Sequence, residues 1–175
     1  SIDEDTELVN LQNSILNGEV VTREPAYYAG GTAAAHSGQD WGNTYAEVDM
    51  SAQHMWYVQN GQVVLETDVV TGEPIPSKIT PEGVYSLMWK QPNSVLVGDI
   101  NPDTGEPAYR TKVKYWMQVT SSGVGFHDAT WQTAFGGTLY QIPGTGSHGC
   151  INMPLDQAGA LFNMIEPGTP VIFHW

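Results

Sequence analysis

The sequence predicts a mainly β fold, because its composition, its turn residues and its aromatic content all favour strands. Its 175 residues include 19 Gly and 11 Pro, and only 14% are charged, which is typical of turn-rich β proteins rather than of helical bundles. Six Trp and eight Tyr favour pleated, half-buried surfaces. Hydrophobic residues make up 41%, enough for the core of a single domain.

The N-terminal stretch predicts one helix, over residues 3–17. Leu8, Leu11 and Ile15 recur at helical spacing, and Gly18 offers a stop after them. Polar residues at the start of this stretch offer N-caps.

A linker composition follows this helix. Residues 29–43 are rich in Gly, Ala, Ser and Asn, which is typical of loops. We therefore expect residues 1–42 to be an N-terminal helix and linker that end an upstream domain, and residues 43–175 to form a separate domain. The sequence begins at Ser1 without an initiator Met or a signal peptide, so we interpret it as a fragment of a longer protein.

The remainder of the chain predicts strands separated by turns rich in Pro and Gly. The strongest local signal is Asn60-Gly61 between two apolar runs at 55–58 and 63–65, because both residues of a two-residue hairpin turn adopt positive φ. Further strands are expected at residues 45–50, 83–89, 95–97, 109–119, 123–127 and 171–175.

One further helix is expected near the C-terminus, over residues 154–166. Pro154 suits the first helical position, and Asp156 favours the helix dipole. Pro167-Gly168 ends the pattern. The apolar face consists of Leu155, Ala158, Leu161, Phe162 and Ile165.

Charge and cysteine content exclude several classes of protein. The formal net charge is −13, so phosphate backbones would repel the chain and nucleic acid is not expected as a partner. The single cysteine excludes an internal disulfide framework. No run of 18 apolar residues is present, so membrane attachment is expected only through a part that precedes Ser1.

The stretch from Gly146 to Asn152 is the first with chemical meaning. A thiolate is a strong nucleophile, and a nearby imidazole or helix N-terminus lowers the pKa of a thiol. Cys150 lies just before the second helix, and His148 is two residues upstream. Gly149 allows a tight turn whose N–H groups could form an oxyanion hole. A buried, inert cysteine is the alternative, whereas the His148-x-Cys150 spacing does not fit zinc ligands, so no metal is expected.

His127 is the second candidate, in a stretch followed by Phe135-Gly136-Gly137. At a strand end it could face a site, although a surface histidine is the commoner case. Asp128 is adjacent in sequence, and adjacent side chains seldom orient each other. We therefore expect a backbone carbonyl to bind the second imidazole nitrogen.

Together these stretches resemble the Gram-positive branch of the L,D-transpeptidase (YkuD-like) family. Its signature is a His, a loop with Phe-Gly-Gly, and Ser/Thr-His-Gly-Cys followed by an apolar residue and Asn. These elements occur in order as His127, residues 135–137, residues 147–150, Ile151 and Asn152. Further similar runs are residues 53–57, 66–72, 81–85 and 115–117, with weaker similarity at 22–25.

The resemblance covers roughly residues 44–175 and implies a YkuD-like β-sandwich with one short helix after the nucleophile loop. Residues 1–17 resemble the tail of the peptidoglycan-binding domain that precedes this domain. Two features depart from the family. Nineteen residues separate His127 from Ser147, with the extra length expected at 141–145, and Gln118 stands where relatives often carry Pro.

The resemblance also implies a reaction, a cysteine-dependent acyl transfer that builds 3→3 cross-links in peptidoglycan. Cys150 would attack the third residue of a tetrapeptide stem, His127 would be the base, and a neighbouring amine would resolve the thioester. His148 would add loop support or electrostatic help. Ser147 and Gly149 are assigned to the oxyanion hole or to loop support. The substrate-binding candidates are Trp131, Asn152 and Tyr109, of which Trp131 could instead be core and Asn152 a helix cap.

The same resemblance implies partners and a location. Stem peptides would be both acyl donor and acceptor, and carbapenem-type β-lactams would acylate Cys150. No cofactor is required. A secreted enzyme of cell-wall biogenesis and cell shape is expected outside the cell, in the wall or at the outer face of the cytoplasmic membrane.

Two other functions remain open from the sequence. With water as acceptor, the same site would be an L,D-carboxypeptidase. A cell-wall binding module without turnover would not need both Cys150 and His127. A papain-like protease fits poorly, because its nucleophile precedes its histidine in the chain.

Overall fold

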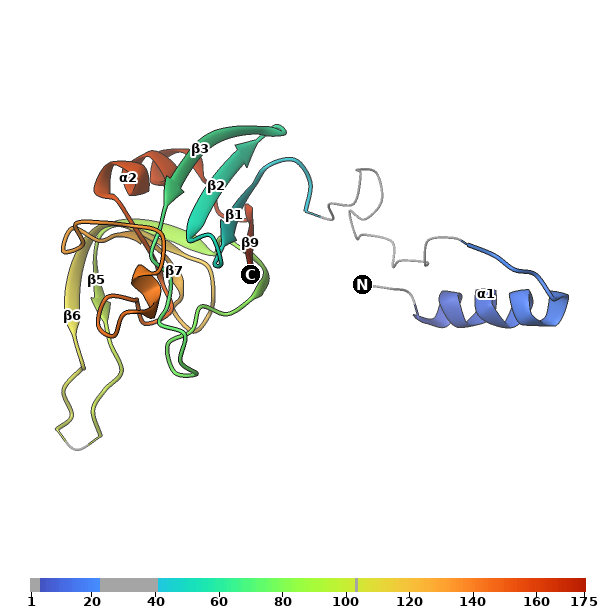
Figure 1. Ribbon diagram of the computed structural model, residues 1–175, viewed down its shortest axis with the longest axis horizontal. Coiled ribbons are helices and arrows are strands. Elements are labelled where there is room, and N and C mark those ends of the chain that lie inside the picture. The colour runs from blue at the N-terminus through green and yellow to red at the C-terminus, as the bar shows by residue number, and fades with distance from the viewer. Residues whose placement is uncertain (1–3, 23–40, 103) are drawn as a thin grey trace. The chain divides into compact units, whose positions relative to one another are not determined.

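The computed structural model describes residues 4–22, 41–102 and 104–175, which form two compact units, Ser1–Gly42 and Asn43–Trp175 (Figure 1). In the first unit, α1 (Glu4–Asn17) confirms the predicted helix. Gly18 adopts a φ of 67°, and the N–H groups of Gly18 and Glu19 bind the carbonyls of Ile15 and Ser14 at 3.2 and 2.9 Å. This Schellman motif ends the helix. Residue 3 and residues 29–40 of the expected linker lie outside the described residues.

The second unit consists of two mixed β-sheets, which confirms the mainly β prediction. The five-stranded sheet has the order β3-β2-β1-β9-β4 and the four-stranded sheet β5-β6-β7-β8. The β1/β9 and β7/β8 pairs are parallel, and the other pairs are antiparallel. The elements are β1 (Tyr45–Asp49), β2 (His54–Gln59), β3 (Gln62–Asp68), β4 (Gly83–Ser86), β5 (Trp89–Val97), β6 (Arg110–Gln118), β7 (Gly125–Asp128), the 3-10 helix η1 (Leu139–Gln141), β8 (Ile151–Met153), α2 (Leu155–Met164) and β9 (Pro170–His174).

The hairpin predicted at Asn60-Gly61 joins β2 to β3. Gln59 pairs with Gln62, and the two turn residues have φ angles of 54° and 79°. This prediction is confirmed, because a two-residue turn with positive φ at both positions matches the twist of the strands.

Three local predictions were wrong in detail. The single strand expected at 83–89 is divided, because β4 pairs with β9 in one sheet whereas β5 begins at Trp89 and pairs with β6 in the other. The strand expected at 95–97 is only the end of β5, in which Asn93 has a φ of 54°. Pro154 is the N-cap of α2 rather than its first helical residue, with a ψ of 143°.

The short strand β8 was not predicted, because its three residues look like part of the loop motif. All three are buried. Its register with β7 is parallel and pairs Phe126 with Ile151 and His127 with Asn152. The two strands thereby bring together two segments that are more than twenty residues apart in sequence.

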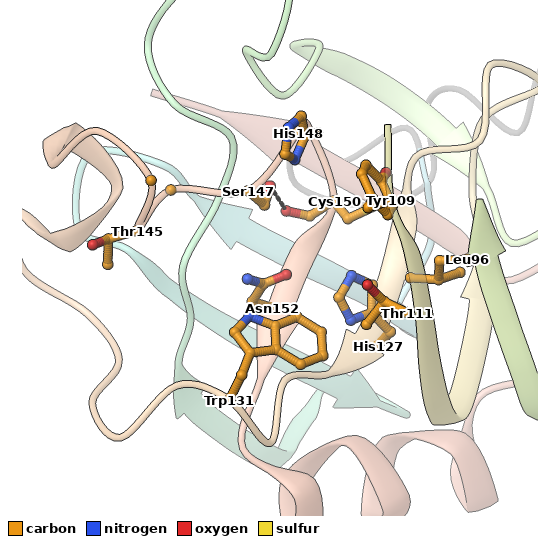
Figure 2. A pocket seen from close by; sticks show the side chains of 12 residues that line it. Leu96, Tyr109, Thr111, His127, Trp131, Thr145, Ser147, His148, Cys150 and Asn152 are labelled. Carbon is orange, nitrogen blue, oxygen red and sulfur yellow. Dashed lines mark hydrogen bonds between the residues drawn. The ribbon is translucent and has the colours of Figure 1, made fainter. Parts of the chain in front are cut away.

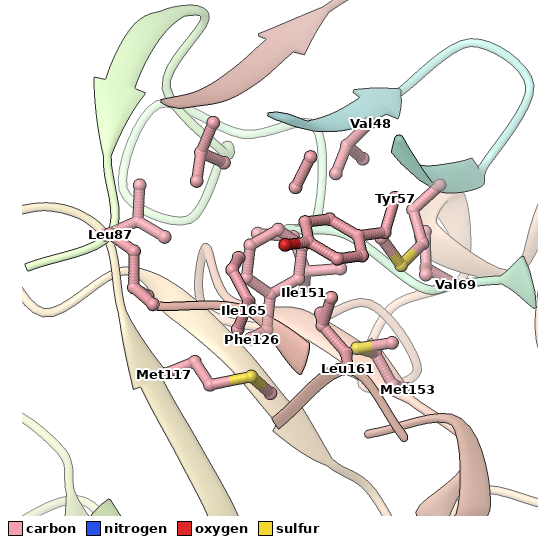
Figure 3. Close-up of a cluster of buried hydrophobic side chains, with 14 of the residues drawn as sticks. Val48, Tyr57, Val69, Leu87, Met117, Phe126, Ile151, Met153, Leu161 and Ile165 are labelled. Atoms are coloured by element: carbon pink, nitrogen blue, oxygen red, sulfur yellow. The ribbon is translucent and has the colours of Figure 1, made fainter. Parts of the chain in front are cut away.

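The hydrophobic core contains side chains of both sheets and of α2 (Figure 3). Phe126, Ile151, Met153 and Leu161 are fully buried in it, and burial of each such side chain stabilises the fold by about 1.5–3 kcal/mol. Because successive strand residues face opposite sides, anchoring Phe126 and Ile151 in the core directs His127 and Asn152 to the other side of the sheet. No helix in the described part of the chain is long and apolar enough to cross a membrane.

Candidate active site

A pocket of about 230 Å³ lies on the side of β7 and β8 that faces away from the core (Figure 2). Its lining includes every residue that the sequence assigned to the site except Gly149. The lining residues are Leu96, Tyr109, Thr111, His127, Trp131, Gly144, Thr145, Gly146, Ser147, His148, Cys150 and Asn152.

The loop that carries the thiol is held by an internal hydrogen-bond network. Ser147 Oγ donates to the Cys150 carbonyl and accepts from the Gly149 N–H at 3.0 Å. The Gly149 carbonyl accepts from Thr80 Oγ1 at 2.8 Å. Gly149 has a φ of 118°, a conformation that other residues rarely adopt. These contacts fix the loop backbone, and they engage the Gly149 N–H inside the loop.

Cys150 is the only cysteine and is partly buried. Burial raises the pKa of its thiol to about 11, and a backbone hydrogen bond with Gly125 opposes that shift. The thiol lies 3.5 Å from the Gly123 carbonyl, to which it donates. The expectation that a helix N-terminus lowers this pKa was wrong, because β8 separates Cys150 from α2 and a helix dipole acts only near its first turn.

The imidazole of His127 has a defined tautomer. Its Nδ1 lies 3.0 Å from the Asp128 carbonyl oxygen, and since a carbonyl only accepts, Nδ1 carries the proton and Nε2 is a free base. This confirms the expected carbonyl partner. Burial lowers the pKa of His127, so the imidazole is neutral at neutral pH. Trp116 and Trp131 flank the ring, with centroids 6.0 and 5.8 Å away.

The Asp128 carboxylate has a different task. Its Oδ1 accepts the backbone N–H groups of Lys114 and Tyr115, both at 2.8 Å, and only 2% of the residue is exposed. It therefore stabilises β6 beside the pocket. This agrees with the expectation that the Asp128 side chain does not orient His127.

Tyr109 reaches the pocket from the β5–β6 hairpin, which projects from the second unit in Figure 1. Its ring lies 5.1 Å from the His148 ring. Gly98 on the opposite arm makes room for it, because a Cβ there would lie 2.6 Å from two carbons of the Tyr109 ring. Burial is the largest cause that raises the pKa of Tyr109, and the charges of Cys150 and Asp99 raise it further. No local sequence pattern pointed to Gly98, since its contact with Tyr109 spans the hairpin.

The structure excludes the alternative roles considered for Trp131 and Asn152, namely a core residue and a helix cap. Trp131 is 51% exposed and is therefore not core. Asn152 does not cap α2, which has Pro154 as its N-cap without a side-chain hydrogen bond. Instead, Asn152 Nδ2 donates to Gln132 Oε1 at 2.6 Å.

The 141–145 loop is tied to a buried carboxylate that the sequence did not identify. Glu73 Oε1 accepts the Gly144 N–H at 2.9 Å and also lies 2.9 Å from Lys78 Nζ. The Lys78 hydrogen bond is the largest cause that lowers the pKa of Glu73, followed by the Gly144 bond. Gly146 packs against the Glu73 side chain, since a Cβ there would lie 2.6 Å from Glu73 Cγ.

The described residues include no group of three or more His, Cys, Asp or Glu side chains arranged to hold a metal ion. The side chains that line the pocket offer a thiol, a neutral imidazole and several polar groups. Such a set can carry out acyl transfer through a thioester.

Comparison with known proteins agrees with this site. The family model of the L,D-transpeptidase catalytic domain, YkuD, matches residues 43–173. A mutant L,D-transpeptidase of Enterococcus faecium is 42% identical with a TM-score of 0.70, covering 99% of this chain and 65% of that one. The catalytic domain of the E. faecium enzyme acylated by ertapenem is 46% identical with a TM-score of 0.63, covering 75% of this chain and 97% of that one.

L,D-transpeptidase 1 of Mycobacterium tuberculosis is 30% identical over 126 residues, which are 70% of this chain and 47% of that protein. The chain thus spans less than half the length of this curated relative. The family match, in contrast, extends over nearly all of the second unit, Asn43–Trp175. The chain therefore belongs to the YkuD family of L,D-transpeptidase catalytic domains.

Proposed function

We propose that this chain is the catalytic part of a peptidoglycan L,D-transpeptidase, with Cys150 as nucleophile and His127 as general base. The observation that carries the proposal is the fixed tautomer of His127 in the pocket that also contains the thiol. Its Nδ1–H is bound to the Asp128 carbonyl at 3.0 Å, so Nε2 is available to take a proton.

The resting pair is neutral. The pKa of Cys150 is raised to about 11 and that of His127 is lowered, in both cases mainly by burial. The proton therefore moves from the thiol to Nε2 as sulfur attacks, rather than residing on a preformed imidazolium.

The proposed reaction has two acyl transfers. Sulfur attacks the carbonyl carbon of the third residue of a tetrapeptide stem, and Nε2 of His127 takes the thiol proton. The C–N bond then breaks, the proton goes to the departing D-Ala amine, and a thioester remains. An amine of a second stem attacks this thioester and gives its proton to Nε2, and the returning proton restores the thiol as the 3→3 cross-link forms.

Backbone N–H groups of His148 and Cys150 are the proposed donors to the oxyanion. The Gly149 N–H is engaged with Ser147 Oγ, so we assign Ser147 and Gly149 to loop support. His148 packs against Tyr109 and is assigned to holding this wall, while Tyr109, Trp131 and Asn152 contact the stem.

β-Lactams and location follow from the same chemistry. The E. faecium catalytic domain is acylated by ertapenem, and we propose that ertapenem acylates Cys150 in the same way. Since peptidoglycan stems are found outside the cytoplasmic membrane, we place the enzyme in the cell wall or at the outer face of the cytoplasmic membrane. The net charge of −13 favours amidated or amine-bearing stems over acidic ones.

The test is an intact-mass measurement after incubation with ertapenem, with Cys150→Ala as the matched control. A single adduct on the wild type that is absent from the variant supports the proposal. No adduct on folded wild type contradicts it. Incubation with a tetrapeptide stem and an amine acceptor then separates cross-linked product from the tripeptide that an L,D-carboxypeptidase would release.

A further inference from the structure

Gln132, which the sequence did not single out, connects two parts of the pocket wall. Its Nε2 donates to the Thr145 carbonyl at 3.3 Å, and its Oε1 accepts from Asn152 Nδ2 at 2.6 Å. The 141–145 loop, β8 and the segment after β7 therefore meet at this one half-buried amide.

The directions of these hydrogen bonds fix both amides. A backbone carbonyl only accepts, so Gln132 must present its nitrogen to Thr145 and its oxygen to Asn152. That oxygen also only accepts, so Asn152 must present Nδ2 to it and turn Oδ1 the other way. The orientation of Asn152 is thus set by the loop carbonyl, through Gln132.

Asn152 Oδ1 is buried and has no hydrogen-bond partner among the described residues. Asn152 is 3% exposed and lines the pocket. Figure 2 shows its oxygen turned toward the His127 side and its nitrogen toward the Thr145 side. Unpaired buried carbonyls are costly and rare in native proteins, so this oxygen is a candidate acceptor for a donor that enters the pocket.

We propose that Gln132 is a positioning residue that holds the Asn152 carboxamide with Oδ1 directed into the pocket, where it accepts an N–H of the bound stem peptide. This inference rests on the proposed function. Gln132 acts through Asn152 and does not itself contact the stem. The 141–145 loop, where we expect the extra length relative to the family, thereby controls a substrate contact through Thr145.

Two substitutions of Gln132 test whether the direction of its hydrogen bond with Asn152 matters. In Gln132→Glu the side chain only accepts, so the hydrogen bond to the Thr145 carbonyl is lost, but Asn152 keeps Nδ2 toward the carboxylate and Oδ1 toward the pocket. In Gln132→Lys the side chain only donates, so it attracts Oδ1 and turns Nδ2 into the pocket. We expect the Lys variant to lose about tenfold in kcat/KM for a tetrapeptide stem, mostly through KM, and the Glu variant to stay within about twofold of wild type.

Gln132→Met, neutral and similar in volume, provides the same readout without a charge and is expected to lose about three- to tenfold. Thermal unfolding of each variant shows that the protein is folded before kinetics are compared. Equal losses in the Glu and Lys variants, or no loss in Lys and Met, would overturn the inference.

A double-mutant cycle tests whether Gln132 acts through Asn152. In the Asn152→Ala background, Gln132→Met is expected to have no further effect on kcat/KM, and additive losses would overturn the proposal. Ertapenem acylation of the wild type is the control. A wild type that is not acylated overturns the proposed function and this inference with it, whereas an active wild type with insensitive Gln132 variants overturns only this inference.

Discussion

The Asp128→Ala substitution is expected to destabilise the domain strongly, whereas Asp128→Asn is expected to leave stability and acylation nearly intact. The carboxylate accepts two backbone N–H groups at 2.8 Å at a site that is 2% exposed. Each buried N–H left without a partner costs about 1–3 kcal/mol, so the Ala variant is expected to lose about 2–6 kcal/mol. The Asn side chain keeps an acceptor oxygen at the same place, and its cost is expected to be about 1 kcal/mol.

Urea unfolding at neutral pH measures these differences as shifts of the midpoint at constant slope. Ertapenem acylation, followed by mass, measures the second half of the prediction. The charge of Asp128 raises the pKa of His127, so Asp128→Asn is expected to move the acid limb of acylation to slightly lower pH without abolishing it. If Asp128→Asn folds normally but loses acylation by two orders of magnitude at pH 7, the carboxylate serves His127 directly and our assignment is refuted.

Three further predictions concern pH and the pocket wall. Because burial lowers the pKa of His127 below its ordinary 6.5, the acylation rate of Cys150 is expected to stay level from pH 7 down to 6.5 and to fall only at lower pH. A stopped-flow profile that already falls between pH 7 and 6.5 would contradict this. The pKa of Glu73 is lowered from 4.5, so its contribution to stability is present above pH 4.5 and is lost as pH falls through its folded value. On acidification, the Tm of wild type is therefore expected to drop further than that of Glu73→Gln, and parallel curves would count against the ion pair. Gly98→Ala places a Cβ 2.6 Å from the Tyr109 ring, and the displaced ring is expected to raise KM for the proposed stem substrate about tenfold, equivalent to about 1.4 kcal/mol of lost binding free energy. Unchanged kinetics would show that Tyr109 does not contact substrate.

The sequence predicted the site best where chemistry is encoded in a short motif. Cys150 and His127 were found because their residue types and order match a family signature, and the structure places both in one pocket. The Asn60-Gly61 turn was found because positive φ at two successive residues has few solutions.

Contacts between distant segments could not be predicted in the same way. Glu73 and Gly144 meet through a hydrogen bond across 71 positions, and no local pattern at either residue indicates the other. The change of sheet between β4 and β5 has the same cause, since an apolar run at 83–89 has no feature that says which partner each half will take. Gln132 was missed because an exposed-looking polar residue in a loop carries no sequence signal.

The parallel pairing of β7 with β8 determines how the connection between them is built. Two parallel strands require a long crossover, and here that crossover contains Trp131, Gln132, η1, the 141–145 loop and the nucleophile loop. Its two ends are pinned by the ladder, while its middle lies at the surface of the pocket. We therefore expect a change of length in its middle, residues 129–145, to reshape the pocket wall while the β7/β8 register still holds His127 beside Asn152.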